Sequence, residues 1–226
     1  MNEFEDIRTE ITRKFVELKL WVSNIPSDST NIEFATISKG LFFVYLYGIY
    51  EEIVRKTICA TVYALNDSSI KIGDCKYELY AVLLSPEFDA LYSVGNEKKW
   101  EKRWDIANKL LSNTQIDIQP DLFPTDGRNI RIRQLQSIAN SFGLKGNVLP
   151  RNETGGYVQE LVDMRNNIAH GNKLPREIGR NYTQEDLLKR CDILSEVCTY
   201  VVSMYEKLVD CLEKCLICRH IRRFAD

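Results

Sequence analysis

Apolar residues recur every three or four positions along most of this chain, which is the spacing of one face of an α-helix. The first 25 residues carry this pattern with charges in between, and Pro26 ends it. A second run, from about residue 34 to 65, is apolar on most sides as far as Tyr47, which predicts the central helix of a bundle. The apolar positions of the first helix are Phe4, Ile7, Ile11, Phe15, Leu18, Val22 and Ile25.

Five further helices are predicted from the same periodicity and from their end signals. We expect Ser85-Pro86 to kink the first of them, Gly143 to end the third as a left-handed cap, and Thr183 with Asp186 to cap the last. The sequence therefore predicts an all-α, single-domain helical bundle over residues 1–226, with a helical and loop insertion around 66–127. The five helices cover about 77–94, 97–111, 129–142, 156–170 and 183–222.

The charge balance and the N-terminal sequence restrict the class of protein. The chain of 226 residues has a net charge of −2, so a nucleic-acid site would have to be a local basic patch. The acidic start lacks the cationic and apolar stretches of an export signal. The most apolar run, residues 41–50, is shorter than the roughly 20 residues that cross a bilayer. We expect a cytoplasmic protein with no membrane partner and with its seven cysteines reduced.

The sixth predicted helix carries the residues best suited to chemistry. At about 100° per residue, Arg165 falls inside its apolar face, while Asn166 and His170 lie one turn apart on the flank. A guanidinium in an apolar face needs an anionic partner, and Glu51, Glu52 or a ligand phosphate would serve. A histidine at a helix end suits general acid or base catalysis. A structurally paired Arg and a capping His are the alternative.

The segment Arg165-Asn-Asn-Ile-Ala-His170, an Arg-x4-His motif with Asn directly after the Arg, resembles the signature of HEPN domains. Its place before a long C-terminal helix also matches, as does the aromatic-acidic element Tyr50-Glu-Glu-Ile-Val-Arg55. More narrowly, the chain looks like the bacterial HEPN ribonucleases of toxin–antitoxin and phage-defence loci. Some HEPN toxins carry a modifiable Tyr two residues after the His, where this chain has Asn172, so that form of control is not expected.

The resemblance implies an all-α HEPN-like fold and RNA cleavage without a metal or cofactor. Two protomers would pair about a two-fold axis and build one composite site. His170 would activate the ribose 2′-hydroxyl or protonate the leaving 5′-oxygen, Arg165 would bind the scissile phosphate, and Asn166 would orient the phosphate or the His. The products would carry 2′,3′-cyclic phosphate (or 3′-phosphate) and 5′-hydroxyl ends. The implied partners are RNA, a second copy of the chain, and an antitoxin or regulatory protein.

Weaker candidates come from basic and cysteine-rich segments. Residues 98–104 alternate lysines and an arginine with Trp100 and Trp104 and could stack bases, although buried tryptophans among solvated lysines are the favoured interpretation. Cys211-x3-Cys215-x2-Cys218 has helical spacing, which favours small core residues over a zinc site. Other candidate RNA contacts, with ordinary surface as the favoured alternative, are Arg128, Arg131, Arg133, Arg151, Arg219, Arg222 and Arg223.

Three hypotheses for the function follow. The leading one is a homodimeric HEPN endoribonuclease that acts as a toxin or antiphage defence effector. The second is a non-catalytic HEPN module that binds RNA, nucleotides or a partner protein, and the third is a purely structural interaction domain. The intact Arg-x4-His motif favours the first.

Overall fold

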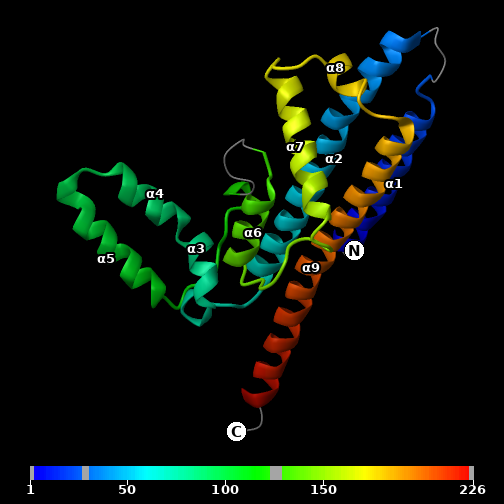
Figure 1. Cartoon of the computed structure of the whole chain (residues 1–226). Helices are drawn as coiled ribbons and strands as arrows, with labels where there is room; N and C mark the ends of the chain where they lie inside the picture. Colours follow the sequence, from blue (N-terminus) through cyan, green and yellow to red (C-terminus); the bar gives the residue numbers. More distant parts are fainter. Residues whose placement is uncertain (1–2, 27–30, 123–128, 224–226) are drawn as a thin grey trace.

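The computed structural model describes residues 3–26, 31–122 and 129–223, and the side chains of residues 121 and 212–223 fall outside the described part. Its long helices form a bundle around one central helix (Figure 1). The central helix, α2 (Ile32–Asp67), packs against α1 (Glu3–Ser23), α7 (Thr154–Ala169) and α9 (Gln184–Arg223). The prediction that the second helix is central is therefore confirmed.

The burial of α2 explains its unusual composition. It is the single helix among the described residues that is long and apolar enough to cross a membrane. Its large side chains instead fill the centre of the bundle, where Phe42, Leu46 and Tyr50 have almost no exposed surface. Contact with other helices over most of its circumference makes α2 the core helix of the bundle, as expected for a helix that is apolar on most sides.

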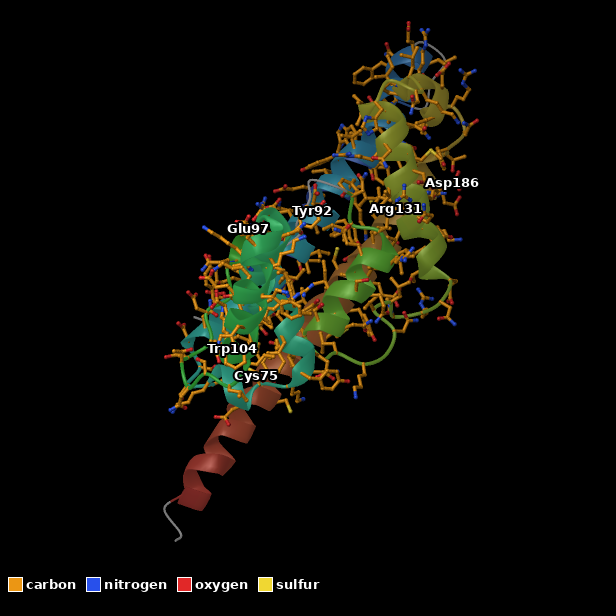
Figure 2. The ribbon with its side chains drawn as sticks, turned by 90° about the vertical axis from the view of Figure 1, so that its left-hand side faces the viewer. Cys75, Tyr92, Glu97, Trp104, Arg131 and Asp186 are labelled. Atoms are coloured by element: carbon orange, nitrogen blue, oxygen red, sulfur yellow. The ribbon has the colours of Figure 1, made fainter. Side chains whose placement is uncertain are left out.

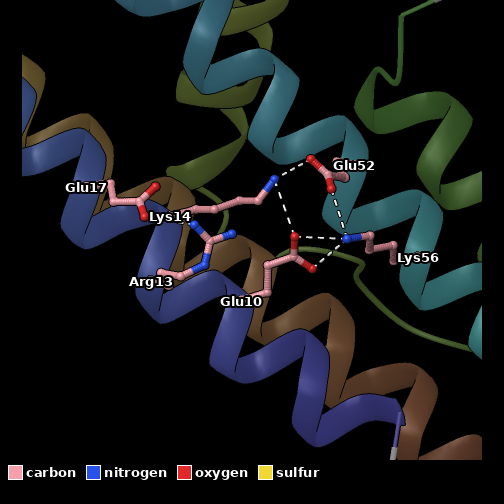
Figure 3. A network of polar contacts seen from close by, with 6 residues as sticks. All are labelled: Glu10, Arg13, Lys14, Glu17, Glu52 and Lys56. Atoms are coloured by element: carbon pink, nitrogen blue, oxygen red, sulfur yellow. Dashed lines mark hydrogen bonds and ion pairs between the residues drawn. The ribbon is translucent and has the colours of Figure 1, made fainter.

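Ion pairs between α1 and α2 lie at the surface of the bundle (Figure 3). Lys56 Nζ lies 2.7 Å from a carboxylate oxygen of Glu10 and 2.9 Å from one of Glu52. Lys14 pairs with Glu52 and with Glu10, the latter at 3.4 Å. The two lysines hold the pKa of Glu52 down at about 2 through their hydrogen bonds. Because each helix contributes one acid and one base, the network fixes how α1 lies along α2.

A short helix that periodicity did not predict, α8 (Pro175–Gly179), packs very closely against the first part of α2. A Cβ added to Gly179 would lie 1.9 Å from the carbonyl oxygen of Thr36, and one added to Gly40 would lie 2.0 Å from that of Pro175. Both obstacles are backbone atoms, so glycine at each position is what lets the two helices approach. This contact holds the segment that follows α7.

The predicted insertion folds mainly into short helices, two of which form an arm. In Figure 1, α4 (Ser85–Ser93) and α5 (Lys99–Leu110) pack against each other and stand away from the bundle. We call residues 85–111 the arm. The helix predicted over 77–94 is broken before Ser85, with Pro86 in the first turn of α4. The remaining elements are η2 (Ile72–Asp74), η3 (Tyr77–Leu79), α3 (Tyr80–Leu83), η4 (Asn96–Lys98), η5 (Pro120–Leu122) and α6 (Ile132–Ser141).

The all-α prediction is confirmed within the described ranges, where the β-structure is limited to an isolated bridge between Lys71 and Gln115. Gly143 ends α6 with a φ of 73°, as predicted. At the start of α9, the Asp186 N–H donates to Thr183 Oγ1 at 3.1 Å and the Thr183 N–H donates to Asp186 Oδ2 at 2.8 Å. This reciprocal pair is the predicted cap. The extent of one domain over residues 1–226 stays a prediction.

Candidate functional site

The helix α7 places Arg165 between itself and α2. Val158, Leu161 and Val162 are buried on the face that packs against the core. Arg165 follows Leu161 by four residues and Val158 by seven, so it lies on the same face. It sits near the end of the helix and is only partly buried. The packing of α7 thus carries a guanidinium into the interface with α2 and leaves part of it accessible.

Neutral groups surround the guanidinium of Arg165. Its Cζ atom lies 4.9 Å from the centroid of the Tyr47 ring, a cation–π arrangement. Its Nη1 atom donates to Asn129 Oδ1 at 3.1 Å and to Asn166 Oδ1 at 3.2 Å. Among the described residues, no carboxylate pairs with Arg165. The guanidinium is therefore held in position by contacts that, within the described part of the chain, leave its positive charge without a carboxylate partner.

The side chain of Tyr47 is fixed by two hydrogen bonds of its hydroxyl group. The hydroxyl accepts a hydrogen bond from the Ile130 N–H at 3.0 Å and donates to Glu51 Oε1 at 3.3 Å. Burial, more than any other effect, raises the pKa of Tyr47 to about 12, so the ring stays a neutral phenol at physiological pH. The Tyr47 hydroxyl also ties the segment before α6 to α2. That segment supplies Asn129, the second amide that binds Arg165.

The two carboxylates that we expected to pair with Arg165 make other contacts instead. Glu52 belongs to the network with Lys14 and Lys56, so the expectation that it neutralises Arg165 is corrected. Glu51 reaches the site only through the Tyr47 hydroxyl. The physical reason is that Lys14 of α1 joins Lys56 of α2 around Glu52, and the periodicity of α2 gives no information about residues of α1.

His170 closes α7 and is exposed to solvent. Its N–H donates to the Asn166 carbonyl oxygen at 3.0 Å, and Gly171 follows with a φ of 70°. The left-handed turn at Gly171 satisfies helix-end carbonyl groups and reverses the chain. The segment then returns to the fold, because the Lys173 N–H donates to the Asn167 carbonyl oxygen at 3.0 Å before α8 begins. Hydrogen bonds thus hold the backbone on both sides of His170, while its side chain is exposed to solvent.

Asn166 connects the two candidate groups of the motif. Its side chain accepts from Arg165, and its carbonyl oxygen accepts from the backbone of His170. Sequence reasoning identified Arg165, Asn166 and His170 but missed Asn129 and Tyr47. Tyr47 gave one usable signal, a polar hydroxyl on the buried side of the central helix. Asn129 gave none, because it approaches Arg165 from a segment 36 residues away in sequence.

The other arginine candidates do not form one open patch among the described residues. Arg131 pairs with Asp163 at 2.8 Å, and Arg151 pairs with Glu196 and, at 3.4 Å, with Glu153. Arg133 is exposed. These contacts support the ordinary-surface interpretation for Arg131 and Arg151. Arg128 and the side chains of Arg219, Arg222 and Arg223 lie outside the described residues.

Two cysteines of α9 pack as apolar residues, whereas Cys211, which was expected to be a small core residue, does not. Cys191 and Cys198 are buried, and burial raises the pKa of each thiol to about 12. Cys211 is exposed, while the side chains of Cys215 and Cys218 lie outside the described residues. Within the described part of the chain, no three His, Cys, Asp or Glu side chains are grouped so that they could hold a metal ion.

Comparison with family models matches residues 9–216 to the family described as RiboL-PSP-HEPN. The chain belongs to the HEPN family. The match begins in α1, includes α7 with the Arg-x4-His motif, and ends within α9. It also runs through residues 66–127, so the arm of this HEPN protein lies inside the family match. No curated protein and no solved structure matches the chain.

Proposed function

We propose that this HEPN protein is a metal-independent endoribonuclease. The observation that carries the proposal is that Arg165, which has no carboxylate partner among the described residues, and the exposed His170 lie near the end of the same helix. A guanidinium fork binds a phosphate with two hydrogen bonds and stabilises the extra negative charge of its transition state. An imidazole in the same site transfers the protons that phosphodiester cleavage requires.

The proposed reaction uses the 2′-hydroxyl of RNA as the nucleophile. One His170 removes the proton from this hydroxyl as its oxygen attacks the adjacent phosphorus. The bond to the 5′-oxygen breaks, and a second imidazole donates a proton to that leaving oxygen. The products are a 2′,3′-cyclic phosphate, which water can open to a 3′-phosphate, and a 5′-hydroxyl. DNA lacks the 2′-hydroxyl and is spared.

The need for a second imidazole leads to a homodimer. This chain has two histidines, and only His170 belongs to the motif. In the proposed dimer, the partner subunit's His170 supplies the second proton-transfer group across a two-fold axis. Asn166 keeps Arg165 aligned with the phosphate, and Asn129 supports it from the other side.

An exposed apolar seam on α2 supports this dimer. Phe34, Leu41 and Val44 are 60%, 42% and 36% exposed, and Ile37 lies between them in sequence. Together with Gly48 they follow the alternating spacing of three and four residues that helices use to pack against each other. Val44 precedes Tyr47 by three residues, so the seam borders the site of Arg165. We call these five residues the α2 seam and propose that it meets its own copy in the partner subunit.

The proposed setting is the cytoplasm, where the enzyme acts as a toxin or an antiphage defence effector. Cleavage of cellular RNA has to be inhibited until the toxin or defence response is triggered. An antitoxin or another regulatory protein is therefore the proposed partner besides RNA and the second copy.

A cleavage assay on total cellular RNA with EDTA tests the proposal. Wild-type protein should cut RNA and leave 2′,3′-cyclic ends, while His170→Ala should lose at least 100-fold of the rate, the size of a general acid–base contribution of about 10² to 10⁴. His220→Ala is the matched control, because it removes the other histidine. Circular dichroism and light scattering establish that each variant is folded and has the mass of the parent. Full activity in His170→Ala would exclude this mechanism, and absence of cleavage by the folded wild type would favour a non-catalytic binding module.

A further inference from the structure

The arm has almost no core of its own. Neither α4 nor α5 has a buried residue, although both are helical along their whole length. In Figure 2 the arm faces the viewer, with Tyr92 and Glu97 at its upper end and Trp104 lower down. In Figure 1 it stands clear of the bundle. Because a segment this exposed contributes little to the stability of the bundle, its side chains can bind a ligand without a change in the core.

An aromatic stripe runs along the outer face of α5. Trp100 is 74% exposed and Trp104 is 67% exposed, so the interpretation that these tryptophans are buried is wrong. Ala107 and Leu111 continue the stripe at the same helical spacing, and Leu111 is 88% exposed. The reason for the error is that α5 meets α4 through the side that carries Lys109, which pairs with Glu87, and Trp100 lies on the opposite side of the helix. Large apolar surfaces that are left exposed in this way mark interaction sites.

Some cationic side chains near this stripe pair with carboxylates of the arm, and others have no such partner among the described residues. Two lysines of α5 are held by carboxylates of the arm: Lys109 pairs with Glu87, and Lys102 pairs with Asp105 at 2.8 Å. Lys98, Lys99 and Arg103 have no ion pair among the described residues. Arg103 lies over the Trp100 ring, with its Cζ atom 4.6 Å from the ring centroid.

Two of these three cations share one edge of the aromatic stripe. At about 100° per residue, Lys99 and Arg103 lie on one side of Trp100 and Trp104, and Glu101 lies on the other. The edge with Lys99 and Arg103 is positive, and the edge with Glu101 is negative. A ligand that fits this face has a negative backbone along one side and flat apolar groups along the other.

We propose that the arm binds single-stranded RNA. Bases stack on the exposed side chains of Trp100 and Trp104, and phosphates follow the edge formed by Lys99 and Arg103. Stacking on aromatic side chains does not depend on the identity of the base, so the arm holds RNA rather than reading its sequence. This site is separate from Arg165 and His170 and lies on a different part of the fold. Its role next to the proposed cleavage is to retain an RNA strand that extends beyond the motif site.

Tryptophan fluorescence tests this in the full-length His170→Ala protein, which keeps the RNA intact. The chain has three tryptophans, and Trp21 packs against Tyr45 in the bundle. Poly(U) should quench the fluorescence of this parent, and the quenching should persist in Trp21→Phe. Replacing both arm tryptophans, Trp100→Ala with Trp104→Ala, should abolish the quenching and raise the Kd measured by anisotropy at least tenfold, since both stacking surfaces are lost. Their exposure means that both substitutions should leave the helical circular dichroism unchanged.

Salt dependence tests the phosphate contacts separately. Lys99→Gln with Arg103→Gln should reduce the slope of log K against log salt by roughly 1.4, or about 0.7 for each lost contact to a single strand. Glu101→Gln is the matched control on the opposite edge and should not reduce the slope.

Each alternative outcome has a defined meaning. Unchanged poly(U) affinity in the double tryptophan variant overturns the proposal. A change in oligomeric mass in that variant, with RNA binding intact, also overturns it and assigns the stripe to a protein contact. The proposed nuclease activity is tested independently with a dinucleotide substrate, whose cleavage depends on His170 and not on the arm tryptophans. Loss of dinucleotide cleavage in His170→Ala and loss of poly(U) binding in the arm variant are therefore separate results.

Discussion

Arg165 lies over the ring of Tyr47, with its guanidinium carbon 4.9 Å from the ring centroid. Tyr47 is 2% exposed and belongs to the central helix, whereas Arg165 belongs to the motif helix. The core of the bundle and the candidate site therefore share one side chain. The ring offers the guanidinium a favourable surface without neutralising its charge. A carboxylate in the same place would compete with an incoming phosphate.

Two substitutions of Tyr47 separate its hydroxyl from its ring. Tyr47→Phe should lower the free energy of unfolding by about 1–3 kcal/mol, because the buried Ile130 N–H loses its acceptor. It should reduce RNA cleavage only slightly, since the ring remains. Tyr47→Leu removes the ring as well and should lower cleavage by a further factor of about ten, corresponding to about 1.4 kcal/mol of cation–π support. Urea denaturation and initial cleavage rates measure the two effects, and equal activity in both variants would contradict the role given to the ring.

The close contact of α8 with α2 predicts a strong effect of a small substitution. Gly179→Ala should destabilise the protein by about 1–3 kcal/mol or more, because its Cβ would lie 1.9 Å from the Thr36 carbonyl oxygen. It should also lower cleavage, since α8 holds the segment that follows His170. Gly156→Ala is the control, because nothing lies within 4 Å of its added Cβ. That variant should be as stable as wild type or more stable by up to about 1 kcal/mol, as measured by urea denaturation.

The network of Glu52 with Lys14 and Lys56 predicts a pH-dependent contribution to stability. The lysines lower the pKa of Glu52 from 4.5 to about 2, so the folded state favours its ionised form. The contribution should be complete above pH 4.5 and should disappear as the pH falls through about 2. Glu52→Gln should therefore cost about 0.5–1 kcal/mol at pH 7, and the difference from wild type should shrink between pH 4.5 and 2. Glu17→Gln, which breaks a pair within α1 only, should show a smaller loss at pH 7. A constant difference at all pH values would exclude this account.

The α2 seam predicts a variant that separates folding from assembly. Val44→Glu places a charge on the exposed seam, where a second copy would bury it. Light scattering should report the mass of a single chain, and RNA cleavage should be lost because the composite site cannot form. Tyr63→Glu is the control, since Tyr63 is 50% exposed on the same helix beyond the seam. A Val44→Glu protein that remains dimeric would assign the two-fold contact to another surface.

The spacing of apolar residues was enough to predict the helices that build the bundle. It placed α1, α2, α7 and α9 within a few residues, because their periodicity extends over many turns. It missed α8, which has five residues and therefore too few turns for a period. It also identified α2 as central, since a helix that is apolar on most sides has to be covered.

The motif residues could be chosen from the sequence, but their surroundings could not. The step of 100° per residue placed Arg165 on the buried face and His170 on the flank, because both lie on one helix. The partners of Arg165 come from α2 and from the segment before α6, and the partners of Glu52 include a lysine of α1. Likewise, the exposure of Trp100 depends on which side of α5 meets α4. Periodicity acts within one helix, whereas these contacts join residues far apart in the chain, so only the packing of helices against one another decided them.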